Sequence, residues 1–276
     1  MLLENIPVEL NSFVRCSGGF KLSLLRFWPR MLIATVLIGL LVWSVNGIQF
    51  STSELISGMH SAVSYMKQMV PPDLSILGSQ VWPSLLLTIQ MAYVGTVIGF
   101  VLALPFGFLA ARSTAFNPIV SSSIKIALNV ARAVPTIIYA ILFVEIVGLG
   151  PFPGALGIGV ASFVMLAKLF AEALESLQPG PIEAVKAAGG STLQVFAYGM
   201  WPQALPQFIS VTLYAWELNL AASFVLGIVG AGGIGQDLLQ SIHYFQWRIV
   251  STYMIVIVLL VLIADATSYQ IRKRVS

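Results

Sequence analysis

Charged side chains are scarce in this chain of 276 residues. Asp, Glu, Lys and Arg make up 9% of it, against about 25% in an average soluble domain. So few charges cannot cover a surface in water, which argues against a soluble globular protein, a disordered chain or a fibrous repeat. Hydrophobic residues make up 58%. The expected solvent is a lipid bilayer, and at about 20 apolar residues per span the length allows roughly five to seven membrane helices.

Residues that build catalytic and metal centres are also few. A single cysteine, Cys16, excludes a disulfide within the chain, and the two histidines are His60 and His243. Neither a Cys pair, a His-x-x-x-His motif nor a carboxylate cluster with metal-ligand spacing is present. The sequence also lacks a P-loop, so we expect no nucleotide hydrolysis in this chain. It is predicted to be a non-catalytic subunit with no cofactor and no metal, and nucleic acid is not an expected partner.

Apolar segments separated by polar ones give the chain its organisation. They predict an all-α integral membrane protein with about six transmembrane helices. The first segment has a basic leader too long for a cleavable signal. We divide the chain into residues 1–80, with the first span and an outer surface segment, and residues 81–276, the transmembrane domain. The six segments are Met31–Ile48, Trp82–Ala111, Ser121–Val147 (interrupted by Arg132 and Pro135), Gly154–Leu174, Phe208–Val229 and Val250–Asp265.

The distribution of basic residues predicts the orientation. With a cytoplasmic N-terminus, six spans return the C-terminus to the cytoplasm, which is an N-in, C-in topology. Ten of the 14 Lys and Arg residues then lie inside, and only Lys67 and Arg248 lie outside. Cytoplasmic loops carry such an excess of positive charge. The segment Phe50–Gln80 is then outside, with a surface helix or two and a turn, and Glu175–Pro206 is inside.

Residues 179–192, within that inner segment, have the pattern of a helix, a glycine break and a second helix. Pro181 suits the first turn of a helix, and Glu183 is placed in the same turn, where the helix dipole favours an acid. Gly189-Gly190 ends the helix, and the following Ser-Thr pair caps the next one, which we expect to stop before Trp201-Pro202. An ordinary loop is the alternative interpretation, but a compact helical hairpin is a shape suited to docking.

A second glycine-rich stretch, residues 230–235, fits the G-x-G-x-x-G pattern. A dinucleotide site also needs a preceding strand and an acid about 20 residues further on, whereas this stretch follows a membrane helix. We therefore interpret it as a tight turn between the last two spans, where glycine permits close backbone approach. Such a turn lets helices pack tightly near an outer gate. The candidate gate residues are Gly230, Gly232 and Gly233.

The inner hairpin resembles the cytoplasmic signature of ABC importer permeases. That signature reads Glu-Ala-Ala, three residues, Gly, nine residues, Ile-x-Leu-Pro. Four residues match at the same spacing: Glu183, Ala184, Gly189 and Pro202. Three positions depart from it: Val185, Gly199 and Trp201. The resemblance implies that residues 175–206 form a coupling hairpin for an ATPase, with Glu183, Ala184, Val185, Gly189 and Pro202 as the coupling residues.

Within that superfamily the chain is similar to permeases of phosphonate-type uptake systems over residues 84–274. The likeness rests on Ser84–Thr88, Arg132–Pro135, Gly148–Phe152, Leu205–Phe208, Gly227–Gly235 and Asp265. It implies a type I ABC importer permease with a methionine-permease-like core, in the bacterial inner (plasma) membrane. The implied partners are a second copy of the permease, two ATP-binding subunits that hold ATP and Mg, an extracytoplasmic binding protein, and membrane lipids. The implied substrate is a phosphonate, phosphite or phosphate-like oxyanion.

Other functions are left open by the residues alone. One alternative is a permease for methionine or another small solute. The others are an integral membrane enzyme or redox subunit, and a channel that acts alone. The scarcity of histidine and cysteine argues against the enzyme or redox subunit.

Polar residues inside predicted spans are costly and need a reason. Lys168 and Glu172 are four apart, so we expect a structural pair on one helix face. Glu217 and Asn219 either line the translocation path or bind a neighbouring helix. Arg132 could attract an anionic substrate, although we favour an anchor to the partner subunit or to a lipid phosphate.

Asp265, near the inner end of the last span, is expected to pair with the terminal bases.

Overall fold

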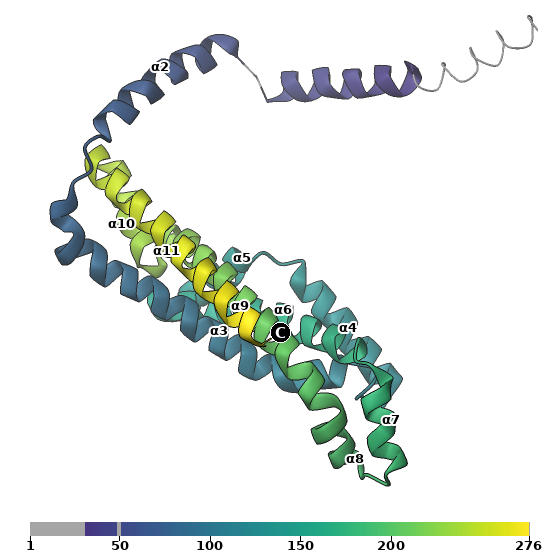
Figure 1. Ribbon diagram of the computed structural model, residues 1–276. Helices are drawn as coiled ribbons and strands as arrows, with labels where there is room; N and C mark the ends of the chain where they lie inside the picture. The colour runs from purple at the N-terminus through teal and green to yellow at the C-terminus, as the bar shows by residue number, and fades with distance from the viewer. Residues whose placement is uncertain (1–30, 49–50, 276) are drawn as a thin grey trace, which may run out of the picture. The chain divides into compact units, whose positions relative to one another are not determined.

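The computed structural model describes residues 31–48 and 51–275, and within these ranges its regular structure is entirely helical. The chain divides into two units, residues 1–64 and residues 65–276. The division of the chain into residues 1–80 and 81–276, which the sequence suggested, stays a prediction. Figure 1 labels the helices α2 to α11, and the two units are described separately below.

In the residues that the structure describes, the first unit contains one helix and most of a second, both with almost no buried surface. One covers Met31–Gly47, which coincides with the first predicted span, and the other is α2, Thr52–Gln68. No residue of α2 is buried, and the large apolar side chains from Met31 to Trp43 are exposed. Apolar side chains gathered in this way need an apolar solvent. This exposure agrees with a helix surrounded by lipid.

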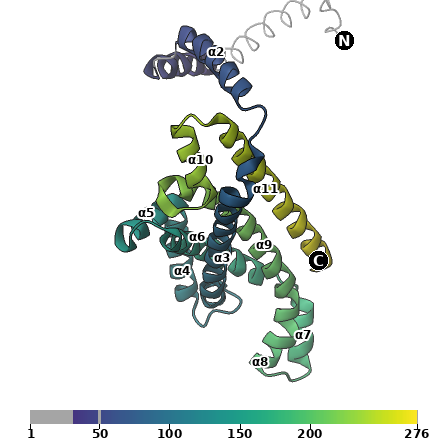
Figure 2. The same cartoon turned by 90° about the vertical axis from the view of Figure 1, so that its left-hand side faces the viewer.

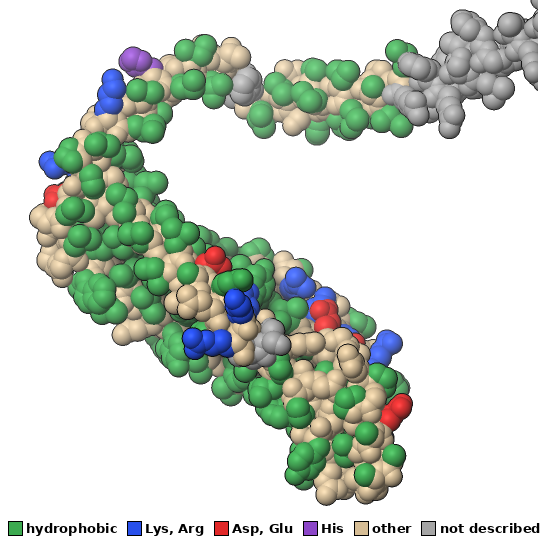
Figure 3. All heavy atoms as spheres, viewed as in Figure 1, with side chains coloured by type: hydrophobic (Ala, Val, Ile, Leu, Met, Phe, Trp, Pro, Cys, Tyr) green, Lys and Arg blue, Asp and Glu red, His purple; other side chains and the backbone are tan. Residues whose placement is uncertain are grey.

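The second unit is a bundle of long helices. Four helical stretches of this unit are long and apolar enough to cross a membrane, and the bent pair Pro118–Arg132 and Thr136–Val147 can form a fifth span. The bent pair Met31–Gly47 and Thr52–Gln68, described above, would make a sixth. Figure 3 shows hydrophobic side chains over most of the visible face, with few charged ones among them. The helices of this unit are η1 (Leu74–Ile76), η2 (Leu77–Val81), α3 (Trp82–Ala110), α4 (Pro118–Arg132), α5 (Thr136–Val147), α6 (Pro151–Glu175), α7 (Pro179–Ala187), α8 (Thr192–Gln194), η3 (Val195–Met200), α9 (Trp201–Leu226), η4 (Gly227–Ala231), α10 (Ile234–His243) and α11 (Trp247–Val275).

The centre of the bundle is the seam between α6 and its neighbours, where glycines allow helix backbones to approach closely. A Cβ atom at Gly157 of α6 would lie 2.6 Å from the Cα atom of Ala140 in α5. A Cβ atom at Gly95 of α3 would lie 2.7 Å from the Cβ atom of Ile158 in α6. Small residues at contact positions are the usual means of packing helices in a bilayer, because lipid provides no hydrophobic drive for their association.

Aromatic rings fill the half of the bundle nearer the inner hairpin. Phe170 of α6 and Phe208 of α9 are 0% and 1% exposed, and their rings stack at 4.2 Å between centroids. Phe100 of α3 meets Phe170 edge-on at 5.8 Å. These pairs connect the three helices at one level, and each adds about 0.5–1.5 kcal/mol beyond the area that it buries.

The predicted third span is not a single helix. It is broken into α4 and α5, whose axes are bent by 82°. The break falls at Val134-Pro135, because proline lacks an N–H group and forces the preceding residue out of the helical region. The interruption that Arg132 and Pro135 suggested within Ser121–Val147 is confirmed.

The helix after the inner hairpin is longer than predicted. It runs from Thr192 through Trp201-Pro202 to Ile228, ahead of the non-helical backbone at Val229 and Gly230, so the expected stop before Trp201-Pro202 was wrong. The cause is the π-helical stretch η3, in which the N–H of Trp201 reaches the carbonyl of Phe196. This wider turn admits the following proline, whose missing N–H would interrupt a regular α-helix.

The predicted outer segment and its turn are present. After α2, Pro71-Pro72-Asp73 turns the chain into η1, and this turn is held against the start of α11. The N–H of Asp73 donates to the carbonyl of Arg248 at 3.2 Å, and Nε of Arg248 donates to the carbonyl of Pro71 at 3.0 Å. The Ser75 hydroxyl, which donates to the Asp73 carboxylate, lowers the pKa of that group.

The sequence missed one helix between the last two spans. The expected tight turn is followed by α10, Ile234–His243, before α11 begins. Its apolar residues at Ile234, Leu238 and Ile242 follow a helical period, which was the available signal. In both Figure 1 and Figure 2, α10 lies toward one end of the second unit, and α7 and α8 lie at the other end. The N-in, C-in orientation stays a prediction, because helix geometry does not distinguish the two sides of a membrane.

The close approach at Gly157 gives a prediction on stability. Gly157→Ala places a methyl group against the backbone of Ala140, and overpacking of this kind costs about 1–3 kcal/mol. We expect thermal denaturation in detergent to show a lower melting temperature. Gly78→Ala is the control, because a Cβ atom there meets nothing within 4 Å. Equal melting temperatures for the two variants would contradict this account of the seam.

Candidate functional site

The inner hairpin predicted from residues 175–206 is built by α7 packing on η3. Ile182 and Val185 of α7 are partly buried, whereas Glu183, Ala184 and Gly189 are exposed. One face of α7 therefore packs against the rest of the hairpin, and the opposite face is exposed. Four of the five predicted coupling residues lie within this single short helix or at its end.

Both ends of the glycine break are closed by backbone hydrogen bonds. The N–H of Gly189 donates to the carbonyl of Lys186, and the N–H of Gly190 donates to that of Val185, each at 3.0 Å. This pair of bonds is a Schellman motif, and it requires the positive φ of 79° that Gly189 adopts. The next helix begins with Ser191 as its N-cap, whose N–H donates to Oε1 of Gln194 at 2.8 Å. The predicted helix, glycine break and second helix are confirmed.

The position of Glu183 within α7 differs from the expectation. The helix begins at Pro179, two residues earlier than the sequence suggested, so Glu183 is its fifth residue and lies beyond the first turn. The reason is that Pro179 already supplies the fixed φ of a helix start. The helix dipole therefore contributes little to Glu183, and its exposed carboxylate is free to meet a partner.

Two residues of the hairpin were not recognised from the sequence. Gly199, which stands where the signature has isoleucine, faces α7, and a Cβ atom there would lie 3.1 Å from the Cα atom of Ile182. Gln203 joins the two arms of the hairpin. Its Nε2 donates to the carbonyl of Gly199 at 2.6 Å, and its Oε1 accepts from the N–H of Gln178 at 3.2 Å. Pro202, the fifth predicted coupling residue, is adjacent to this link.

Asn219, a candidate for the translocation path, sits at the junction of three helices. It is 7% exposed, and its Nδ2 donates to Oγ1 of Thr96 at 2.8 Å and to Oγ of Ser162 at 2.6 Å. These bonds connect α9 with α3 and α6. Of the two alternatives for this residue, the structure displays the bond to neighbouring helices, and a role in the path stays a prediction.

Glu217, the other polar candidate of α9, forms an ion pair with α11. Its Oε1 lies 2.8 Å from Nη2 of Arg272. We expected Asp265 to pair with the terminal bases, but one of these bases, Arg272, forms its ion pair with Glu217 instead. Since α9 and α11 pack side by side, the partner of Arg272 lies across the helix interface and is invisible to sequence spacing.

Of the three candidate gate glycines, Gly230 lies at the kink within η4, Gly232 and Gly233 lie between η4 and α10, and all three have positive φ. The carbonyl of Gly230 accepts from the N–H of Gly150 at 3.1 Å. Directly after Gly233, the N–H of Ile234 donates to Oγ1 of Thr88 at 2.9 Å. The turn is thereby attached to the beginnings of α6 and α3. Its role as a gate stays a prediction.

Charged side chains between α4 and α6 are paired. Lys125 Nζ lies 2.6 Å from Oε1 of Glu175. Lys168 Nζ lies 4.0 Å from Oε1 of Glu172, which confirms the expected pair, and donates to Oδ1 of Asn129 at 2.8 Å. These contacts fix the inner part of α4 against α6.

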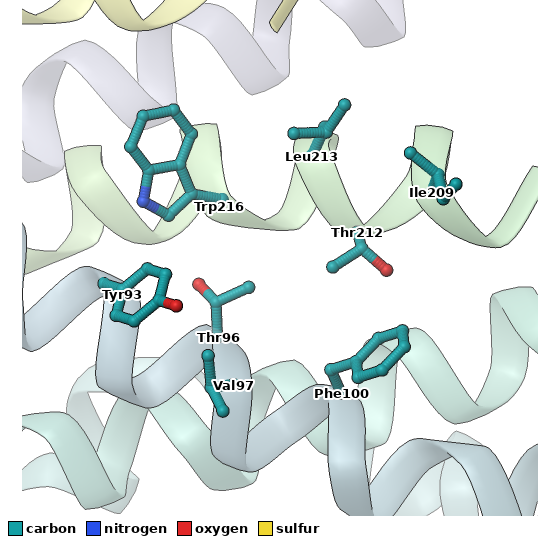
Figure 4. A pocket seen from close by; sticks show the side chains of 8 residues that line it. All are labelled: Tyr93, Thr96, Val97, Phe100, Ile209, Thr212, Leu213 and Trp216. Carbon is teal, nitrogen blue, oxygen red and sulfur yellow. The ribbon is translucent and has the colours of Figure 1, made fainter. Parts of the chain in front are cut away.

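An apolar cavity of about 460 Å³ opens between α3 and α9. Figure 4 shows its side chains, which come from the two helices facing each other. Apart from the hydroxyl groups of Tyr93, Thr96 and Thr212 and the indole N–H of Trp216, the lining is hydrocarbon, and none of it is charged. This cavity offers no counter-charge to an oxyanion. Its lining residues are Tyr93, Thr96, Val97, Phe100, Ile209, Thr212, Leu213 and Trp216.

Two solved structures of ABC transporters share this fold. A structure of the MetNI methionine ABC transporter in an inward-facing conformation matches with a TM-score of 0.66 and 22% identity, over 74% of this chain and 100% of that one. The structure of an amino acid ABC transporter with histidines matches with a TM-score of 0.59 and 15% identity, over 78% of this chain and 97% of that one. The expected fold, an all-α type I importer permease, is confirmed.

Relatives with higher identity cover most of the chain. The phosphite transport system permease protein PtxC of Stutzerimonas stutzeri is 39% identical over 271 residues, which are 98% of this chain and 97% of that protein. The phosphate-import permease protein PhnE of Mycolicibacterium smegmatis is 34% identical over 242 residues, which are 88% of this chain and 46% of that protein.

The family described as "Binding-protein-dependent transport system inner membrane component" matches residues 103–276. This range includes the hairpin, the glycine turn and every long helix from α6 onward. Together with the relatives and the fold, it establishes the predicted family and the inner-membrane location. The chain belongs to the binding-protein-dependent transport system inner membrane components, as the permease subunit of an importer.

Proposed function

We propose that this permease forms the path by which phosphite, phosphonate or phosphate-like oxyanions enter the cell. The observation that carries the proposal is the 39% identity, over nearly the whole of both chains, to a permease named for phosphite transport. The phosphate-import relative supports the same class of substrate. Both names refer to a phosphorus oxyanion. In this proposal, a binding protein delivers that anion on the outer side of the membrane.

The partners in this proposal are a second permease copy, two ATP-binding subunits and the binding protein. The sequence contains no P-loop, so the work of transport comes from a separate ATPase that holds ATP and Mg. The exposed face of α7, with Glu183 and Ala184, fills a groove on that ATPase. The face that Ile182 and Val185 occupy stays on the permease and transmits the force.

The mechanism follows from the continuity of the helix after the hairpin. The helical stretch from Thr192 to Ile228 ends where Val229 and Gly230 leave the helical conformation, and at about 1.5 Å per residue it spans roughly 55 Å. It begins beside α7 and ends at the glycine turn. A displacement of the hairpin when the ATPase subunits close is therefore carried by one rigid element to the far end of the bundle. Access then alternates between the two sides of the membrane.

Glu183→Ala tests the docking face. Loss of the exposed carboxylate removes a contact to the ATPase, and we expect uptake by the reconstituted transporter to fall about tenfold or more, as for a lost charge-assisted hydrogen bond. Stimulation of ATP hydrolysis by the binding protein is expected to fall in parallel. Glu54→Ala, which removes an exposed carboxylate from α2, is the control. Full uptake with normal stimulation in Glu183→Ala would show that the coupling assignment is wrong.

Gly189 provides a second test that depends on backbone conformation. Gly189→Leu forces a bulky residue into positive φ, which costs about 1–2 kcal/mol, so we expect a displaced hairpin and uncoupled ATP hydrolysis. Gly189→Asn is expected to retain most of the transport, because asparagine tolerates this conformation. Gly180→Leu is the matched control within α7, since a Cβ atom there meets nothing within 4 Å. Equal transport by all three variants would contradict the role of this break.

The substrate class is tested with the purified transporter in proteoliposomes. We expect ATP-dependent uptake of at least one of phosphite, phosphate and a simple alkylphosphonate when the binding protein is present. Methionine serves as the competing solute. Uptake of methionine with none of the three oxyanions would reverse the assignment of the substrate.

A further inference from the structure

Arg132 differs from the other bases of the bundle. It is the last residue of α4, at the break before α5, and it is exposed in the single chain. Lys125, Lys168 and Arg272 each have a carboxylate within 4.0 Å. In the part of the chain that the structure describes, no hydrogen bond or ion pair joins the guanidinium of Arg132 to another side chain.

The depth of Arg132 makes this charge costly. The side chains around it include Ala161, Val164 and Met165 of α6, which lie in the middle third of a helix that runs from Pro151 to Glu175. Arg132 is therefore far from both ends of this span. The carbonyl groups at the end of α4 favour a positive charge, but they replace only part of the hydration that an arginine loses in a bilayer.

A cavity of about 140 Å³ adjoins Arg132. Thr136 and Tyr139 of α5 also line it, and the Tyr139 hydroxyl donates to the carbonyl of Ala131 at 2.7 Å. Since a water molecule occupies about 30 Å³ in the liquid, the cavity has room for an anion of four or five heavy atoms. Phosphite and phosphate have this size. The cavity thus combines a guanidinium, a threonine hydroxyl and the volume of a small oxyanion.

We propose that Arg132 and this cavity form a binding site for the phosphorus oxyanion on its way through the membrane. A planar guanidinium can donate two parallel hydrogen bonds to two oxygens of such an anion. This inference rests on the proposed function, and it reverses our preference for an anchoring role of Arg132. The headgroup phosphate of a lipid has the same chemistry, but the mid-span depth favours the transported anion over a group that lies at the membrane surface.

Uptake kinetics test the site directly. The complete transporter, with its ATPase and binding protein, is reconstituted with wild-type permease, Arg132→Gln, Arg132→Lys or Lys125→Gln, and phosphite and phosphate uptake are measured. We expect Arg132→Gln to raise KM about tenfold or more, the usual effect of losing a charge-assisted hydrogen bond. Arg132→Lys keeps the charge without the planar fork and should lie between Arg132→Gln and wild type. Lys125→Gln, which removes the same charge from the same helix, should stay within about twofold, because exposed ion pairs contribute little.

Each result separates this inference from the proposed function. If the wild-type transporter takes up neither oxyanion, the substrate assignment fails. If it does, and Arg132→Gln leaves KM unchanged or Lys125→Gln changes it equally, only the site at Arg132 fails. A lipid headgroup is distinguished in nanodiscs with and without anionic phospholipid. If Arg132→Gln abolishes a lipid-dependent rise in melting temperature but leaves KM unchanged, the bound phosphate belongs to lipid and the proposal is overturned.

A chemical probe gives a readout that does not depend on transport. Met165→Cys, in a chain whose one native cysteine is removed by Cys16→Ser, places a thiol in the cavity wall. An anionic methanethiosulfonate reagent is expected to react several times faster, relative to a cationic one, when Arg132 is present than in Arg132→Gln. Phosphite should slow this reaction. A charge preference that does not change with Arg132, or a thiol that neither reagent reaches, would overturn the proposal, because a site on the path must open to water.

Discussion

The close approach of helix backbones at small residues is the constraint on which the bundle depends. In lipid, apolar side chains gain little by leaving their solvent for one another, so van der Waals contact between well-matched surfaces must hold the helices together. Gly157 against Ala140 and Gly95 against Ile158 provide such surfaces around α6. Because these contacts bring α3, α5 and α6 so close, the buried amide of Asn219 can reach hydroxyl groups on two other helices. The polar network therefore depends on the packing.

The hairpin shows the same dependence on a small scale. Gly199 lets α7 lie against η3, Gln203 joins the arms, and Gly189 closes the helix with its positive φ. With these three residues fixing the backbone, Glu183 and Ala184 need no internal role and are left exposed. In the proposed transporter, a rigid hairpin of this kind transmits displacement, whereas a loop of equal length would absorb it.

Much of this could be predicted from the sequence, for identifiable reasons. Apolar length located the spans, and the Gly189-Gly190 pair with its following caps located the hairpin, because both signals are local. The interruption of the third span at Pro135 was predicted, but its bend of 82° was not, because no sequence pattern specifies the angle. The continuation of the helix through Pro202 was missed because a π-turn has no residue signature. The helix α10 was missed because the glycine-rich turn before it was interpreted without the apolar period that follows.

The partners of Glu217 and Asn219 lie on other helices, 55 and more positions away in the sequence. The role proposed for Arg132 likewise could not be predicted from the sequence, because only the structure displays the cavity beside it.

The long helix from Thr192 to Ile228 also constrains how this protein can change. An α-helix turns by about 100° per residue, so inserting or deleting one residue inside α9 would rotate everything beyond it relative to the hairpin. Gln203 and Asn219 would then no longer face their present partners together. This helix can therefore accept substitutions but not insertions or deletions. Length variation among related chains should be confined to the connections outside it. The number of residues in this helix thus fixes the directions in which side chains at its two ends point relative to each other.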